Sequence, residues 1–147
     1  MAYKQEYMEL AIELAKKGTG AVNPNPLVGA VIVKDDRIIG QGYHARYGDL
    51  HAERAAFASL TEDAEGAEMY VTLEPCPMCA GATVNARVDR IVFGTEDEAM
   101  GACGTAVSVT SLKNAFKPEL YRGLLCKECT AILRRFFKAR RAERTEK

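Results

Sequence analysis

Two short stretches of the sequence hold residue types that bind metal ions and move protons. His51-Ala52-Glu53 places an imidazole and a carboxylate two positions apart, and Pro75-Cys76-Pro77-Met78-Cys79 brings two thiols close together. They supply three ligands that zinc accepts, His51, Cys76 and Cys79, with Glu53 beside them. A structural zinc site normally has four protein ligands, whereas a catalytic site has three and keeps a position for water. Since no other Cys or His adjoins these stretches, the pattern favours a catalytic zinc site.

A Zn²⁺ ion at this place would bind a water molecule and lower its pKa towards about 7. The resulting hydroxide can attack a carbon that bears an exocyclic amine next to a ring nitrogen. Glu53 is the carboxylate tied to the motif, so we expect it to carry protons from the water to the ring nitrogen and to the departing ammonia. Each motif alone has a plainer interpretation, because His-x-Glu pairs are common on helices and a lone CxxC can be redox-active or a structural zinc knuckle.

The hydrophobic pattern predicts the elements that must position these residues. Helices are expected at 6–17, 51–59, 76–85 and about 124–141, and strands at 27–33, 37–43, 68–73 and 90–93. A turn at 34–36 makes a hairpin, and 101–110 is predicted as a loop followed by a short strand. This order predicts an α/β fold with three α/β/α layers and a central mixed sheet of about five strands. Both metal-binding stretches would begin helices, whose N-termini favour thiolates.

The last predicted helix carries two further features. Its apolar side chains are expected to face inward: Leu125, Ile132, Leu133, Phe136 and Phe137. Cys126 and Cys129 repeat the CxxC spacing, which fits either packing of the helix or a second metal site.

The composition of the chain restricts the classes of protein to which it can belong. The 147 residues predict a single domain, 1–147, and the zero net charge gives the whole molecule no strong attraction to nucleic acid or membranes. No leader and no apolar run long enough to span a bilayer is present, so we expect no membrane partner. Five cysteines, an odd number, favour a cytoplasmic metalloprotein over a secreted disulfide scaffold. The basic tail offers candidate RNA-contacting residues, although a charged terminal helix is usually only solvated: Arg134, Lys138, Arg140 and Arg141.

The combination H-x-E…P-C-x-x-C resembles the zinc nucleobase deaminases, and nearly the whole chain is similar to the cytidine-deaminase-like superfamily. The N-terminal half, with 23–33, Gly42-Tyr43-His44 and His51-Ala52-Glu53, resembles the pyrimidine deaminase domain of riboflavin biosynthesis. The C-terminal half, with 75–82, 90–94, 101–104 and Phe136-Phe137-Lys138, resembles tRNA-specific adenosine deaminases. The resemblance implies a cytidine-deaminase-like fold, a homodimer, and a base pocket lined by Asn25, His44 and Ala52. Plainer interpretations of Asn25 and His44 are a turn residue before Pro26 and a loop residue at the surface.

Each half departs from the other's pattern. Riboflavin deaminases generally separate the two cysteines by a longer insertion with a lysine suited to a substrate phosphate, whereas two residues separate Cys76 from Cys79. The tRNA enzymes usually have Asn where His44 stands and a longer loop after it. Our first expectation for the substrate is adenosine in a tRNA anticodon loop, where a base is presented unstacked. The alternative is a small pyrimidine or nucleotide as in riboflavin biosynthesis, without the reductase activity of bifunctional enzymes because no reductase-like segment follows. A hypothesis of another class is a non-catalytic, zinc-stabilised partner subunit.

Overall fold

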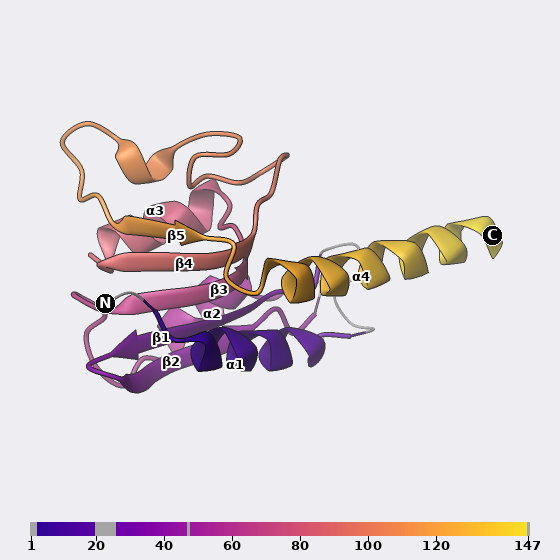
Figure 1. Cartoon of the computed structure of the whole chain (residues 1–147), viewed down its shortest axis with the longest axis horizontal. Coiled ribbons are helices and arrows are strands. Elements are labelled where there is room, and N and C mark those ends of the chain that lie inside the picture. The colour runs from indigo at the N-terminus through magenta and orange to yellow at the C-terminus, as the bar shows by residue number, and fades with distance from the viewer. Residues whose placement is uncertain (1–2, 20–25, 47, 147) are drawn as a thin grey trace.

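The computed structural model describes residues 3–19, 26–46 and 48–146, and its centre is a five-stranded sheet (Figure 1). The strands lie in the order β2-β1-β3-β4-β5. They are β1 (Gly29–Lys34), β2 (Arg37–Tyr43), β3 (Glu68–Leu73), β4 (Arg90–Thr95) and β5 (Glu119–Arg122). β1 pairs antiparallel with β2 and β3, whereas β3–β4 and β4–β5 are parallel pairs. The predicted mixed sheet is confirmed.

The predicted hairpin turn closes on two aspartates. Asp35 and Asp36 have φ of 50° and 61°, the left-handed backbone that a two-residue turn of this kind requires. Asp residues adopt this conformation more readily than most non-glycine residues because their short side chains bond locally. The turn therefore sets the pairing of β1 with β2.

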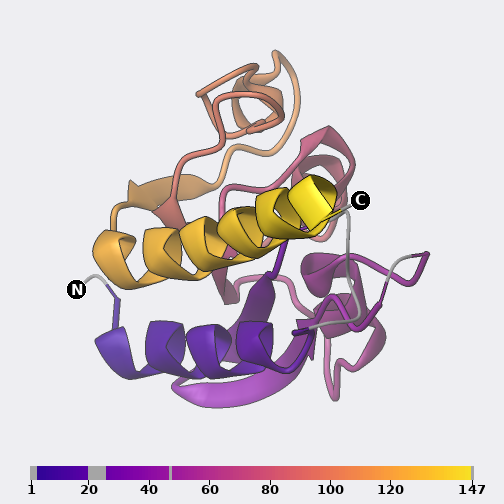
Figure 2. The same cartoon turned by 90° about the vertical axis from the view of Figure 1, so that its right-hand side faces the viewer.

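Helices cover both faces of the sheet, as predicted. They are α1 (Gln5–Lys16), α2 (Ala52–Ala58), α3 (Pro77–Asn85) and α4 (Cys126–Glu146). Alternate residues of β1 point to opposite faces, so Ala30 and Ile32 join a core with α2 and α3, while Val31 and Val33 join a second core with α1 and α4. This is why the sequence of β1 is almost continuously apolar. Figure 2 shows α1 and α4 side by side, and in Figure 1 α4 continues beyond the end of the sheet.

Two predictions for the C-terminal third are wrong, and one strand there was not predicted. The short strand expected after the loop at 101–110 is a 3₁₀ turn, Val109–Ser111, preceded by an isolated bridge between Cys103 and Ser108. The fifth strand is instead β5, which is short and carries charged residues at both ends. Phe137 does not face inward but is 41% exposed, because Cys129, Ile132 and Phe136 occupy the face of α4 that meets the core.

Across the described ranges, no helix combines the length and the apolar character needed to cross a membrane.

Candidate active site

The three predicted zinc ligands lie together between the starts of two helices. His51 is the N-cap of α2, Cys76 is the N-cap of α3, and Cys79 lies in the first turn of α3. Nδ1 of His51 is 3.7 Å from Sγ of Cys76 and 3.6 Å from Sγ of Cys79. The ligand atoms of the three residues all lie within 4.8 Å of one another. Within the part of the chain that the structure describes, this is the one group of three such side chains placed to hold a metal ion.

The chemistry of these donors fits zinc. A hydrogen bond from the Cys79 thiol is the main cause that lowers the pKa of Cys76 to about 5, and His51 lowers it further. The pKa of Cys79 is correspondingly raised, because the two sulfurs share a proton and Cys79 is buried. Two thiolates and one imidazole nitrogen would hold a divalent cation here, with loss of that proton. The local fold thus keeps three ligands ready for one ion.

Glu53 lies beside the metal ligands and is buried, with 4% of its surface exposed. Its position in the first turn of α2 follows from the two-residue step from His51. Burial is the main cause that raises the pKa of Glu53 to about 7. A carboxyl group with a pKa near neutrality can both take up and release a proton, which is what a proton carrier requires.

A cavity of about 240 Å³ opens onto His51, Glu53 and Cys76. Of the predicted pocket residues, His44 and Ala52 line it, and Asn25 lies outside the described residues. His44 is buried rather than at the surface: Nδ1 donates a hydrogen bond to the carbonyl of Leu50, 3.0 Å away, and its ring meets that of His51 edge-on. His44 therefore both fixes the segment before His51 and faces the cavity.

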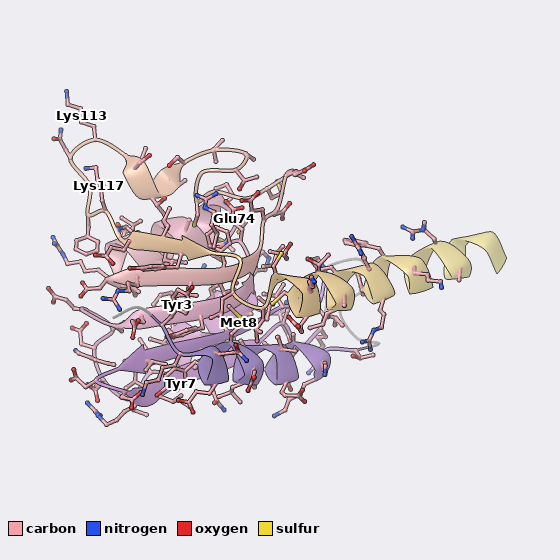
Figure 3. All side chains as sticks on the ribbon, in the orientation of Figure 1. Tyr3, Tyr7, Met8, Glu74, Lys113 and Lys117 are labelled. Atoms are coloured by element: carbon pink, nitrogen blue, oxygen red, sulfur yellow. The ribbon has the colours of Figure 1, made fainter. Side chains whose placement is uncertain are left out.

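An acidic part of the cavity lining, Glu74 and Asp97, was not predicted from the sequence. Glu74, labelled in Figure 3, follows β3 and is buried, with 2% of its surface exposed. One of its carboxylate oxygens accepts the backbone N–H of Asp97 at 3.2 Å, and the other accepts those of Cys103 at 2.9 Å and Thr105 at 3.3 Å. The loop that carries Asp97 and Met100 to the cavity is thus attached to Glu74. The acidic run at 96–98 was the available sequence signal.

The close approach of this loop depends on Gly101. A Cβ atom on Gly101 would collide with the backbone carbonyl oxygen of Asp97 and lie 2.5 Å from Cδ and Oε1 of Glu74, so the loop would have to move away. Asp97 further shapes the loop by accepting the backbone N–H groups of Ala99 and Met100 on Oδ1. The segment after β4 is therefore a built wall of the cavity.

The other predicted site residues lie away from the cavity lining. Cys129 is buried against Gly94, Cys126 is exposed, and among the described residues neither belongs to a group of three metal-binding side chains. Of the two interpretations of this CxxC, packing of the helix therefore fits Cys129. Arg134 and Lys138 are exposed on α4, as is Arg141, while the side chain of Arg140 is outside the described set.

Comparison with known proteins agrees with the fold and with a zinc-binding deaminase domain. Residues 1–95 match the family model of the cytidine and deoxycytidylate deaminase zinc-binding region. The chain therefore belongs to this family of zinc-dependent deaminases, hydrolases that act on nucleobase amines, and its cofactor is zinc.

Three relatives indicate which kinds of deaminase this chain is similar to. The chain is 41% identical to the riboflavin biosynthesis protein RibD of Actinobacillus pleuropneumoniae over 90% of its own length but 36% of that protein. It is 35% identical to the diaminohydroxyphosphoribosylamino-pyrimidine deaminase of Buchnera aphidicola, covering 92% of this chain and 94% of the relative. A solved tRNA:A34 deaminase, studied for A-to-I editing at the wobble position, superposes with a TM-score of 0.76 at 34% identity, covering 88% of this chain and 100% of the other. The chain thus spans little more than a third of the RibD protein but nearly the whole of the Buchnera deaminase.

Proposed function

We propose that this protein hydrolyses the exocyclic amine of a small aminopyrimidine, of the kind used in riboflavin biosynthesis, and releases ammonia. The observation that carries the proposal is the position of Glu53. It is buried in the cavity that also opens onto His51 and Cys76, so a proton-carrying carboxyl group, the metal ligands and space for a ring lie in one place.

Each group of residues in the site would have its own role in this reaction. His51, Cys76 and Cys79 would hold zinc, which when bound activates water at neutral pH. Glu53 would accept the two protons of the attacking water in turn, passing the first to the ring nitrogen and the second to the leaving amine, and would end the reaction ionised as it began. Ala52, Val28 and Leu73 give the cavity apolar walls that would contact the ring, and His44 also lines it. Asn25 would complete the pocket.

The relatives favour a pyrimidine over our first expectation of adenosine in tRNA. The riboflavin-type proteins match at up to 41% identity over 90% of the chain, and one of them is a deaminase of nearly the same extent as this chain. Only two residues separate Cys76 from Cys79, whereas we expect a longer insertion in riboflavin enzymes. This short spacing is the feature in which the chain resembles the tRNA enzymes instead.

Adenosine in a tRNA anticodon loop is the second candidate because the tRNA:A34 deaminase structure matches over its whole length at 34% identity. In that case the exposed Arg134 and Lys138, with Arg140 and Arg141, would contact RNA phosphates. Such contacts would make RNA affinity fall steeply as salt is added. The homodimer and the cytoplasmic location expected from the sequence stay predictions.

The test is ammonia release by the zinc-loaded protein, offered a diaminopyrimidine ribosyl phosphate, the corresponding nucleoside and a tRNA anticodon stem-loop in parallel. We expect turnover of a pyrimidine and no inosine in the RNA. Inosine formation without pyrimidine turnover would favour the second candidate.

The Glu53→Gln variant separates an enzyme from a non-catalytic partner subunit. We expect it to retain zinc and to lose about 10²–10⁴-fold in rate, the usual contribution of a positioned acid–base group. A zinc-loaded parent protein that releases ammonia from none of the three compounds would instead support the subunit hypothesis.

A further inference from the structure

The second pair of cysteines lies at the start of α4, outside the active site. Cys126 is the first residue of this helix and Cys129 follows three positions later. The backbone N–H of Cys129 donates to the carbonyl of Leu125 at 3.0 Å, which closes the first helical turn around both cysteines. Residues three apart on a helix are neighbours on its surface, with Cβ atoms about 5–6 Å apart. The helix itself therefore places these two free thiols close together.

The two thiols differ in their access to solvent. Of the five cysteines, all of which lie in the described ranges, Cys126 is the exposed one, whereas Cys129 has 1% of its surface exposed. The pKa of Cys129 is raised to about 12, mainly by burial and further by the neighbouring Cys126. A reagent from solvent therefore meets Cys126 first, and Cys129 keeps its proton until an acceptor is brought next to it.

The side chain of Cys129 fills a gap that Gly94 leaves in β4. A Cβ atom on Gly94 would collide with Sγ of Cys129 and lie 2.8 Å from its Cβ, so the sulfur packs directly on the backbone of the strand. Next to this contact, the hydroxyl of Thr130 donates to that of Thr95, the last residue of β4, at 3.2 Å. These two contacts attach the start of α4 to β4.

A disulfide between the two cysteines would change this packing. It requires sulfur atoms about 2.05 Å apart and Cβ atoms about 3.5–4.5 Å apart, closer than a regular helix places them. The first turn of a helix can shift by this amount more easily than its middle, because its N–H groups are not bonded to a preceding turn. Sγ of Cys126 lies 3.8 Å from Oγ1 of Thr130. To meet it there, Sγ of Cys129 must leave the gap at Gly94.

We propose that Cys126 and Cys129 are a redox-active pair, which low-molecular-weight disulfides oxidise to an intramolecular disulfide that loosens α4 on β4. The thiolate of Cys126 attacks one sulfur of a disulfide RSSR, so that a mixed disulfide forms and RS⁻ leaves with the proton of Cys126 as RSH. Cys129 then attacks the sulfur of Cys126, and its proton passes to the second departing RS⁻. Two cysteine thiols thus lose two electrons and two protons, and RSSR becomes two RSH. None of these steps involves the zinc site or its substrate.

The test treats the zinc-loaded protein with oxidised glutathione, blocks the remaining thiols and digests the product with trypsin. Lys127 lies between the two cysteines, so trypsin cleaves there and the disulfide joins peptides 123–127 and 128–134. We expect this joined pair, lighter than the separate peptides by two hydrogen atoms, and its loss on reduction. We expect oxidation to lower the melting temperature by about 2–4 °C, the shift that loss of one packed contact gives in a domain of this size.

Two variants assign the roles of the two thiols. Cys126→Ser changes an exposed side chain, so it should fold like the parent, give no joined peptides and keep its melting temperature when oxidised glutathione is added. In Cys129→Ala the second thiol is missing, so one glutathione should remain on peptide 123–127 as a mixed disulfide. Cys126→Ser serves as the matched control even if Cys129→Ala, which changes a buried residue, folds poorly.

Three results would overturn the proposal. A parent protein in which both thiols stay reduced has no redox-active pair. Glutathione that remains on Cys126 of the parent, or a disulfide that joins two molecules through Cys126, would show that Cys129 does not act as the second thiol. Joined peptides with an unchanged or higher melting temperature would show that the disulfide forms without loosening α4 on β4.

Discussion

The backbone N–H of Cys103 lies 2.9 Å from Oε2 of Glu74, a residue 29 positions earlier in the chain. Glu74 stands two positions before the metal ligand Cys76, and the loop it holds supplies Asp97 and Met100 to the cavity. One buried carboxylate therefore links the turn that carries a zinc ligand to the wall that would contact substrate.

Replacing Glu74 by Gln should loosen that wall without removing the metal. The amide of Gln offers one acceptor oxygen where the carboxylate has two, so at least one buried or partly buried N–H among those of Asp97, Cys103 and Thr105 loses its partner. We expect the free energy of unfolding to fall by about 1–3 kcal/mol and KM for the pyrimidine to rise more than kcat falls. Urea denaturation, steady-state kinetics and zinc content measure the three quantities.

Glu68→Gln is the matched control for this prediction, at the other end of β3. Glu68 pairs with Arg90 at 3.0 Å near the surface, so its loss should cost less than about 1 kcal/mol and leave KM unchanged. Equal effects of the two substitutions on KM would show that Glu74 has no particular role in shaping the cavity.

The zinc site should depend on Cys79 and not on the second CxxC. In Cys79→Ser a buried thiol that lies 3.6 Å from His51 is replaced by a poorer zinc ligand, so zinc content after desalting should fall. The melting temperature of the parent stripped of metal should rise on adding zinc, because an ion that binds the folded state stabilises it, and this rise should be smaller in the variant. Cys126→Ser, at an exposed cysteine of α4, should retain zinc and the full shift. Loss of zinc from Cys126→Ser would assign a metal to the second CxxC.

The sequence predicted those parts of the fold whose signal is local. β1 is recognisable because both of its faces are buried, which makes Ala30 to Val33 continuously apolar. The three zinc ligands were predicted together because His51, Cys76 and Cys79 belong to two short motifs that each begin a helix. Neither inference needs knowledge of distant contacts.

The missed features depend on contacts between segments far apart in the chain. Glu74 and Asp97 read as ordinary polar residues until the loop folds back onto β3, 23 positions away. β5 shows only a short hydrophobic pattern because it is a short strand at the edge of the sheet. Its two central residues pack on opposite faces, Leu120 against one core and Tyr121 against the other. Val107 was expected in a strand, but it lies in a loop and is 52% exposed. The same loop is held by the backbone N–H of Thr105, which donates to Glu74, and by that of Ala102, which donates to the carbonyl of Pro75.

Two glycines should respond in opposite ways to substitution by alanine. A Cβ on Gly29 would collide with the carbonyl oxygen of Ala11 and lie 2.7 Å from the backbone nitrogen of Ala15, so α1 would have to move away from β1. We expect Gly29→Ala to lower the free energy of unfolding by about 1–3 kcal/mol or more. Gly81, inside α3, has open space around its Cα, and Gly81→Ala should raise stability by about 0.5–1 kcal/mol. Urea denaturation of both variants checks the signs, and a stable Gly29→Ala protein would contradict the close packing of α1.

The turn between β1 and β2 should make stability depend on pH through Asp36. Lys4 donates a hydrogen bond to Asp36 at 2.7 Å and the Tyr7 hydroxyl donates another at 2.6 Å, and these bonds lower the pKa of Asp36 below its usual value. A carboxyl group whose pKa is lowered by folding stabilises the protein above its unfolded-state pKa of about 3.9, and this contribution is lost as the pH falls through the folded-state value. Asp36→Asn keeps a residue that tolerates the left-handed turn but removes the charge.

We therefore expect Asp36→Asn to have a lower urea midpoint than the parent near pH 7, and the difference to shrink as the pH is lowered from about 5 to about 2. Asp35→Asn is the control, because Asp35 has the same backbone conformation but has 80% of its side chain exposed and lies 3.9 Å from Arg37, beyond hydrogen-bond distance. Its midpoint should stay close to that of the parent at every pH. A difference between parent and Asp36→Asn that is constant with pH would mean that the substitution acts through the backbone of the turn, and that the bonds from Lys4 and Tyr7 to the ionised carboxylate do not hold α1 to the hairpin.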